Sequence, residues 1–172
     1  MSTMVTKLEN EEMSNDPDYL VKNYVKKGVS EYLLTWVILG GTAFMTHKPT
    51  SVYDFISASN KGIKRQSIIN LADVMAVPMK DMAGLLNISY KTFSRKNDNE
   101  VFDVVVSSLS IEIANTISRG LSVFEDAGKF NRWLYKENRA LNNSKPFNLL
   151  NTLTGIKMVN RILNRLEEGV YT

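Results

Sequence analysis

The C-terminal stretch of the chain, residues 129–172, reads KFNRWLYKENRALNNSKPFNLLNTLTGIKMVNRILNRLEEGVYT. Over residues 155–168 its apolar side chains recur at three- and four-residue steps, which predicts an amphipathic helix. This apolar stripe consists of Ile156, Val159, Ile162, Leu163 and Leu166. Packing on the chain's own core explains the stripe. It does not explain the ending Gly169-Val170-Tyr171-Thr172, because a short free tail has little reason to be aromatic unless another surface receives it.

Helical periodicity also dominates upstream, so the sequence predicts an all-α fold. Residues 31–39 fit either a short helix or a strand, and the run Val104-Val105-Val106 favours strand by propensity although it lies in a helical pattern. Residues 1–17 show no sustained period and are expected to form a flexible arm. The helices are expected over residues 18–27, 52–59, 63–75, 78–86, 89–96, 100–125 and 129–136, before the last one.

Composition excludes several classes of function. The 172 residues are 44% hydrophobic and include no cysteine, which rules out a disulfide framework, a thiolate metal site and a cysteine nucleophile. The single histidine, His47, is expected in an exposed loop, so we predict no metal site, no catalytic residue, no cofactor and no enzymatic activity. No signal peptide or membrane span is evident, because the apolar run over residues 32–45 is too short; a cytoplasmic protein is expected.

Charge is divided among segments. Residues 61–96 hold seven basic and two acidic residues, residues 97–128 hold one basic and six acidic, and residues 129–172 hold eight basic and three acidic. Such alternation indicates different surfaces for different partners.

The segment 79–96 meets the packing demands of a helix-turn-helix. Ala83 supplies a small residue where two helices cross, and Asn87 is one of the few non-glycine residues that readily adopt a left-handed turn. Ile88 and Phe93 are placed to lock the second helix onto the first. The second helix is then the candidate recognition helix, and its candidate DNA-binding residues are Ser89, Tyr90, Lys91, Thr92, Arg95 and Lys96. A structural helix pair with a solvated basic face fits the same pattern.

The order and spacing of residues 129–172 resemble the toxin-binding domain of Xre/MbcA/ParS-type bacterial antitoxins. The features that carry the resemblance are the Trp-Leu pair at Trp133, the polar loop, the Thr-Leu-Thr-Gly turn and the Gly-Val-Tyr-Thr end. The resemblance extends upstream to about Leu39, through the motifs Ile63-Lys64-x2-Ser67, Leu85-Leu86-x-Ile88-Ser89 and Thr92-Phe93-x-Arg95. Lys91 departs from it, since these antitoxins commonly carry arginine there.

The resemblance implies a partner: a RES-domain toxin that degrades NAD, or a related ADP-ribosyltransferase toxin. Asn151 stands where aspartate is usual and Thr172 where serine is common. The toxin-binding residues implied are Asn138, Arg165, Glu168, Gly169, Val170, Tyr171 and Thr172. The loop positions that match are Leu141, Pro146, Leu149, Leu150, Thr152 and Gly155.

We therefore expect a flexible arm over residues 1–17, a helix-turn-helix domain over 18–100 and a small helical toxin-binding domain over 101–172. The protein is expected to be an antitoxin that blocks its toxin sterically and, as a homodimer on operator DNA, represses its own operon. The alternative is a stand-alone transcriptional regulator whose C-terminal domain oligomerises or senses a ligand. Four apolar residues are candidates for either a dimer contact or the core: Leu33, Trp36, Val37 and Phe44.

Overall fold

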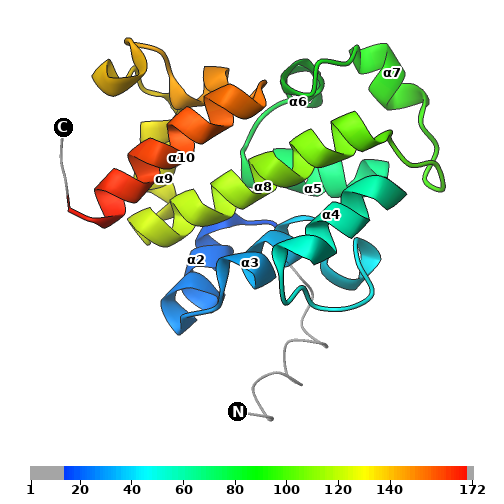
Figure 1. Ribbon diagram of the computed structural model, residues 1–172, viewed down its shortest axis with the longest axis horizontal. Coiled ribbons are helices and arrows are strands. Elements are labelled where there is room, and N and C mark those ends of the chain that lie inside the picture. The colour runs from blue at the N-terminus through cyan, green and yellow to red at the C-terminus, as the bar shows by residue number, and fades with distance from the viewer. Residues whose placement is uncertain (1–13, 170–172) are drawn as a thin grey trace.

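The computed structural model describes residues 14–169, and within them the predicted all-α fold is confirmed (Figure 1). This part of the chain has nine α-helices, four 3-10 turns and no strand beyond two isolated bridges. The α-helices are α2 (Pro17–Asn23), α3 (Glu31–Ile38), α4 (Val52–Lys61), α5 (Arg65–Val74), α6 (Met79–Leu85), α7 (Tyr90–Arg95), α8 (Val104–Phe124), α9 (Ala127–Tyr135) and α10 (Leu153–Glu167). The 3-10 turns are η1 (Val25–Lys27), η2 (Gly41–Ala43), η3 (Arg139–Leu141) and η4 (Pro146–Leu149).

Helix α8 is the centre of the fold. It crosses the middle of Figure 1, with α3 and α4 packed on one side of it and α10 alongside it on the other. Its buried residues Ile111, Ile113, Ile117 and Leu121 are at most 2% exposed and belong to one continuous core. Because α8 contacts helices from both halves of the chain, the two halves share this core.

The start of α8 differs from the sequence prediction, which placed it at residue 100. The backbone N–H of Phe102 donates to the carbonyl of Ile63 at 2.9 Å, and this long-range bond holds the segment before the helix extended. Asp103 then caps the helix, since its carboxylate accepts from the N–H groups of Val105 and Val106, each at 2.9 Å. Tertiary pairing therefore delays the helix by four residues, and the β-branched valines enter its first turn.

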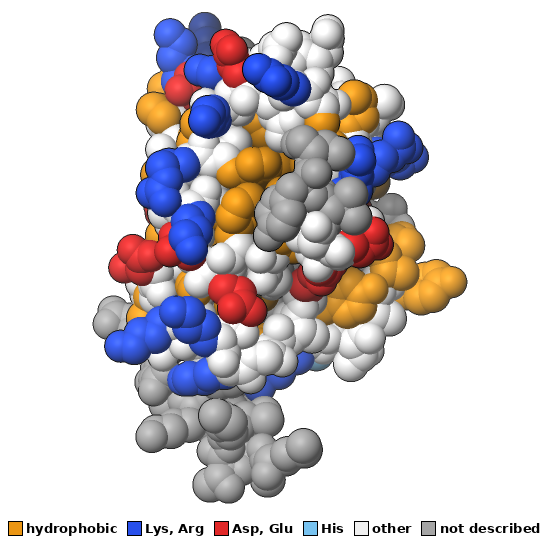
Figure 2. Space-filling model, turned by 90° about the vertical axis from the view of Figure 1, so that its left-hand side faces the viewer, with side chains coloured by type: hydrophobic (Ala, Val, Ile, Leu, Met, Phe, Trp, Pro, Cys, Tyr) orange, Lys and Arg blue, Asp and Glu red, His pale blue; other side chains and the backbone are white. Residues whose placement is uncertain are grey.

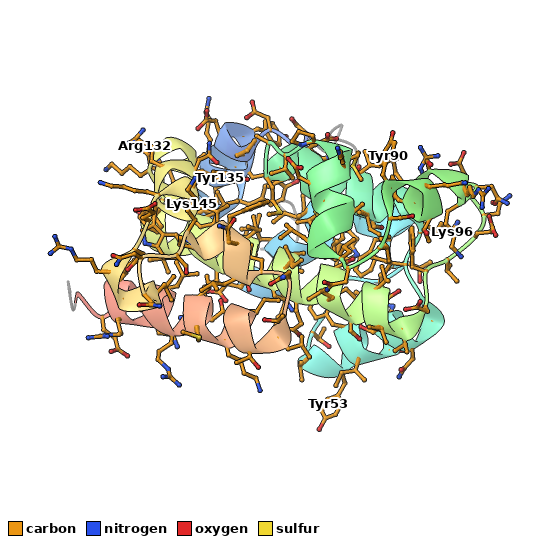
Figure 3. The ribbon with its side chains drawn as sticks, turned by 90° about the horizontal axis from the view of Figure 1, so that it is seen from above. Tyr53, Tyr90, Lys96, Arg132, Tyr135 and Lys145 are labelled. Atoms are coloured by element: carbon orange, nitrogen blue, oxygen red, sulfur yellow. The ribbon has the colours of Figure 1, made fainter. Side chains whose placement is uncertain are left out.

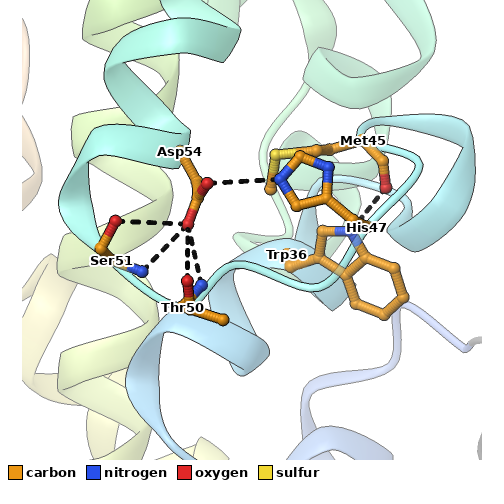
Figure 4. Close-up of polar contacts among 6 residues, drawn as sticks. All are labelled: Trp36, Met45, His47, Thr50, Ser51 and Asp54. Carbon is orange, nitrogen blue, oxygen red and sulfur yellow. Dashed lines mark hydrogen bonds and ion pairs between the residues drawn. The ribbon is translucent and has the colours of Figure 1, made fainter.

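The ambiguous segment 31–39 forms α3, capped by the hydroxyl of Ser30. Trp36 and Val37, candidates for a dimer contact or the core, are buried at 6% and 2% exposure and lie in the core. Leu33 and Phe44 are half-buried and pack against it. The indole N–H of Trp36 donates to the carbonyl of Met45 at 2.8 Å (Figure 4), which satisfies its polar atom inside the fold.

The single histidine lies where the sequence predicts, in an exposed loop before α4. Its Nε2 atom is 3.3 Å from Oδ1 of Asp54 (Figure 4). The other oxygen of Asp54 accepts from the backbone N–H groups of Thr50 and Ser51 at the start of α4. These hydrogen bonds, with that of His47, lower the pKa of Asp54 to about 2, because they stabilise the ionised carboxylate. His47 therefore contacts the carboxylate that caps α4.

Gly120 lets α9 approach the backbone of α8. A Cβ atom at this position would lie 2.1 Å from the ring of Phe130, so no larger residue fits without displacement. Phe130 and Phe124 pack with Trp133 at ring-centre distances of 5.6–6.1 Å. Trp133 is half-buried in this aromatic cluster and packs against the core.

Candidate functional site

The helix-turn-helix geometry predicted for residues 79–96 is present as α6, a turn and α7. Ala83 and Phe93 are buried at 0% and 1% exposure where the helices meet, and Ile88 is half-buried beside them. Asn87 has a φ of 57°, the left-handed conformation expected of it. The ring of Phe93 stacks on that of Phe102 at 5.9 Å, which anchors α7 to the segment preceding α8.

The candidate DNA-binding residues lie on and around α7. The hydroxyl of Ser89 accepts from the N–H of Thr92 at 2.9 Å and caps the helix. Tyr90, Lys91 and Arg95 are exposed on its outer side, and Figure 3 shows Tyr90 pointing away from the molecule. The structure thus leaves the aromatic and basic side chains of α7 accessible.

Lys96 differs from the other candidates because its ammonium group is already engaged. It donates to the carbonyl of Val101 at 2.8 Å and lies 5.5 Å from the ring centre of Phe102. Since the side chain is half-buried, a contact with an external partner would compete with these interactions.

In the C-terminal part, Asn138 organises the loop between α9 and α10. Its side-chain oxygen accepts from the N–H of Ala140 at 2.9 Å, which caps η3, and its backbone pairs with Ser144. Leu141, Pro146 and Leu150 fix this loop by burial. The sequence predicts Asn138 as a toxin-binding residue, and this stays a prediction; the structure shows its role in capping η3.

The turn before α10 explains the Thr-Leu-Thr-Gly spacing. The hydroxyl of Thr152 accepts from the N–H of Gly155 at 3.0 Å and caps the helix. A Cβ atom at Gly155 would lie 2.0 Å from the carbonyl oxygen of Leu149. The helix therefore begins against the backbone of η4, which only glycine permits.

Besides Asn138, the described members of the predicted toxin-binding set lie at the end of α10. Arg165 is half-buried in the last turn, Glu168 is exposed, and Gly169 has a φ of 75°. Val170, Tyr171 and Thr172 lie outside the described residues. Figure 2 shows the end of the molecule where α10 finishes: basic side chains are spread over it, with acidic ones among them and hydrophobic ones near its centre.

Arg119 joins this end of α10 to α3. Its guanidinium forms ion pairs with Glu167 on α10 and with Glu31, the latter at 3.5 Å. Burial raises the pKa of Glu31, and the nearby Glu167 adds to the rise, while Arg119 opposes it. The arginine thus holds two carboxylates of different helices close together.

Two hydrogen bonds that the sequence did not predict connect the C-terminal part to the N-terminal half, one at the turn of the helix-turn-helix and one at the end of α5. The side-chain amide of Asn87 donates to the carbonyl of Asn151 at 2.9 Å. The hydroxyl of Tyr135 donates to the carbonyl of Met75 at 2.8 Å, and its ring packs on Phe147. Burial, and to a lesser degree Asp81, raises the pKa of Tyr135 to about 12. No local sequence pattern marks such long-range bonds.

Neither a metal site nor a membrane helix is found in residues 14–169. No group of three or more His, Asp or Glu side chains in this range is arranged to hold a metal ion. None of its helices combines the length and the apolar character needed to cross a bilayer.

Residues 119–169 comprise the last residues of α8, two amphipathic helices and the capped loop between them. This segment matches the family model described as the antitoxin Xre/MbcA/ParS C-terminal toxin-binding domain. The chain therefore carries a C-terminal toxin-binding domain of this family, which supports an antitoxin role. The match starts at Arg119 inside α8 and ends at Gly169. No curated protein matches the chain.

Proposed function

We propose that this protein is the antitoxin of a type II toxin–antitoxin pair and that it blocks a RES-domain toxin that degrades NAD. The match of residues 119–169 to a toxin-binding domain carries the proposal. The inhibition is steric and needs no chemistry from this chain: the domain covers the toxin's cleft. The end of the chain, from Arg165 to Thr172, approaches the toxin's active site. A related ADP-ribosyltransferase toxin is the second candidate partner.

The test is neutralisation of the toxin encoded next to this gene. The purified full chain should suppress NAD consumption by that toxin, and a chain lacking residues 169–172 should lose much of this protection. Both chains should bind operator DNA equally, because α7 and the C-terminal end of α10 lie at opposite ends of the molecule (Figure 1). If the full chain leaves NAD consumption unchanged, the protein is not the antitoxin of that toxin, and a stand-alone regulator becomes the better interpretation.

The same proposal includes repression of the protein's own operon in the cytoplasm. The geometry of α6 and α7 supports it, because Lys91 and Arg95 are exposed on a helix packed as a recognition helix. The residues we assign to the DNA contact are Ser89, Tyr90, Lys91, Thr92, Arg95 and Lys96. We also propose that the DNA-binding domain ends near residue 100 and that the toxin-binding domain follows from residue 101.

We also propose that the protein binds its operator as a homodimer, since helix-turn-helix dimers bind two-fold related half-sites. Apolar side chains are exposed on and near α4: Tyr53 is 75% exposed, Ile56 50% and Val52 47%, with Tyr32 of α3 at 41%. Figure 3 shows Tyr53 projecting from the molecule. If Tyr53→Lys leaves the sedimentation coefficient of a dimeric protein unchanged, α4 is not the dimer contact.

A further inference from the structure

The outer face of α10 is not used by the fold. Gly155, Ile156, Val159, Ile162 and Leu163 are buried against α8 and the preceding loop. Lys157, Met158, Arg161 and Asn164 lie on the opposite side of the helix and are exposed. The helix therefore presents a polar, basic stripe to its surroundings.

The basic residues of this stripe have no acidic partner in the described part of the chain. No ion pair within residues 14–169 involves Lys157, Arg161 or Arg165, whereas Glu167 of the same helix is paired with Arg119. The three cations follow one another at four-residue steps, a spacing at which like charges destabilise a helix. The helix dipole favours Arg165 in the last turn but not Lys157 in the N-terminal half. Helix stability alone thus gives no reason for the stripe.

An apolar groove continues the stripe at the N-terminal end of α10. It has a volume of about 370 Å³ and lies between the start of α8, the turn at Asn87 and the start of α10. Val104, Val105 and Leu153 line it and are 48%, 71% and 54% exposed. Such exposed apolar side chains around a hollow are typical of a contact with another molecule.

We propose that this groove and the basic stripe of Lys157, Arg161 and Arg165 form one docking surface for an acidic protein surface of the toxin. An apolar side chain of the partner enters the groove, and carboxylates beside it pair with Lys157 and Arg161. The inference rests on the proposed antitoxin function and adds the chemistry of the partner. It also adds a contact area distant from the chain's end, because the groove lies at the opposite end of α10.

The position of the stripe favours a protein over DNA. In Figure 3 α10 lies along one side of the molecule, whereas Tyr90 and Lys96 of the helix-turn-helix lie on the opposite side. The exposed Leu153 and Met158, which border the stripe, also suit a protein contact better than a phosphate backbone.

The test measures the affinity of the full chain for the purified toxin encoded next to its gene, at low and high salt. The double variant Lys157→Glu/Arg161→Glu should weaken binding about tenfold or more at low salt, with less dependence on salt than the original chain. Lys22→Glu/Lys26→Glu, on α2 and η1, is the matched control and should bind normally. Val105→Asp should also weaken binding about tenfold, because it places a charge in the apolar groove. Its carboxylate lies in the first turn of α8, where acids favour the helix, so the fold is retained.

The outcomes distinguish a failure of the antitoxin function from a failure of the docking surface. If the original chain binds no toxin, the proposed function fails. If it binds and both variants bind equally well, the docking surface is wrong while the antitoxin function stands. If the double variant loses affinity for operator DNA and keeps its affinity for the toxin, the stripe is a nucleic-acid contact and the proposal is overturned. Circular dichroism of each variant excludes unfolding as the cause.

Discussion

The side-chain amide of Asn87, in the turn of the helix-turn-helix, donates a hydrogen bond of 2.9 Å to the carbonyl of Asn151, 64 residues later. Asn87 thus does two things, because its left-handed backbone forms the turn while its side chain ties that turn to the start of α10. This hydrogen bond joins the candidate DNA-binding helix-turn-helix directly to the toxin-binding domain.

Substitutions at Asn87 should separate these roles. Asn87→Gly keeps the left-handed turn and removes the hydrogen bond to Asn151, so it should lower the free energy of unfolding by about 1 kcal/mol. Asn87→Ala also introduces backbone strain at φ 57° and should cost about 1 kcal/mol more. Urea unfolding measures both. An alanine variant as stable as the glycine variant would contradict the strain argument.

Tyr135→Phe should lower stability by about 1 kcal/mol, because it removes the hydrogen bond to the carbonyl of Met75. The pKa of Tyr135 is raised from 10 to about 12, so the folded state favours the neutral phenol. The stabilisation that follows from this raised pKa is fully present below pH 10 and is lost as the pH rises through 12. Urea midpoints measured between about pH 9 and 12 should fall less in the variant, once the ordinary tyrosines common to both proteins are subtracted. If the urea midpoints of the two proteins fell equally with pH, the pKa of Tyr135 would not be raised in the folded state.

Glycine-to-alanine substitutions at two helical sites should change the stability of the fold in opposite directions. Gly155→Ala should destabilise by about 2–3 kcal/mol, since its Cβ would collide with the carbonyl of Leu149. Gly84→Ala, in α6, meets no atom within 4 Å and should stabilise by about 0.5–1 kcal/mol through helix propensity. Thermal unfolding of both variants measures these two changes in stability. A tolerated alanine at 155 would mean that α10 can move away from η4.

The double variant Lys91→Ala/Arg95→Ala should weaken operator binding and reduce its dependence on salt, because each removed cation leaves one DNA phosphate without a protein partner. The log–log slope of affinity against salt concentration should fall by about one unit for each such phosphate. Fluorescence anisotropy over a series of salt concentrations measures both quantities. Lys22→Ala/Lys26→Ala removes two exposed lysines from another part of the surface and serves as control. Equal affinity and slope in the two double variants would place the DNA contact elsewhere.

Local patterns in the sequence predicted most of the helices, the turn at Asn87 and the match of the C-terminal segment to a toxin-binding family. These features depend on neighbours within a few residues: helical spacing, a capping hydroxyl such as that of Thr152, or a side chain that tolerates positive φ. The unassigned segment 31–39 and the early start expected for α8 show the limit of such patterns, because both depend on contacts distant in the chain.

Only the tertiary structure decided which side chains meet. The bond from Phe102 to Ile63 delays α8, and the burial of Trp36 and Val37 places them in the core. The ammonium of Lys96 turns to the carbonyl of Val101, and Asn87 reaches Asn151. These pairings come from packing several helices around α8, and their energies depend on three-dimensional proximity that no short stretch of sequence encodes.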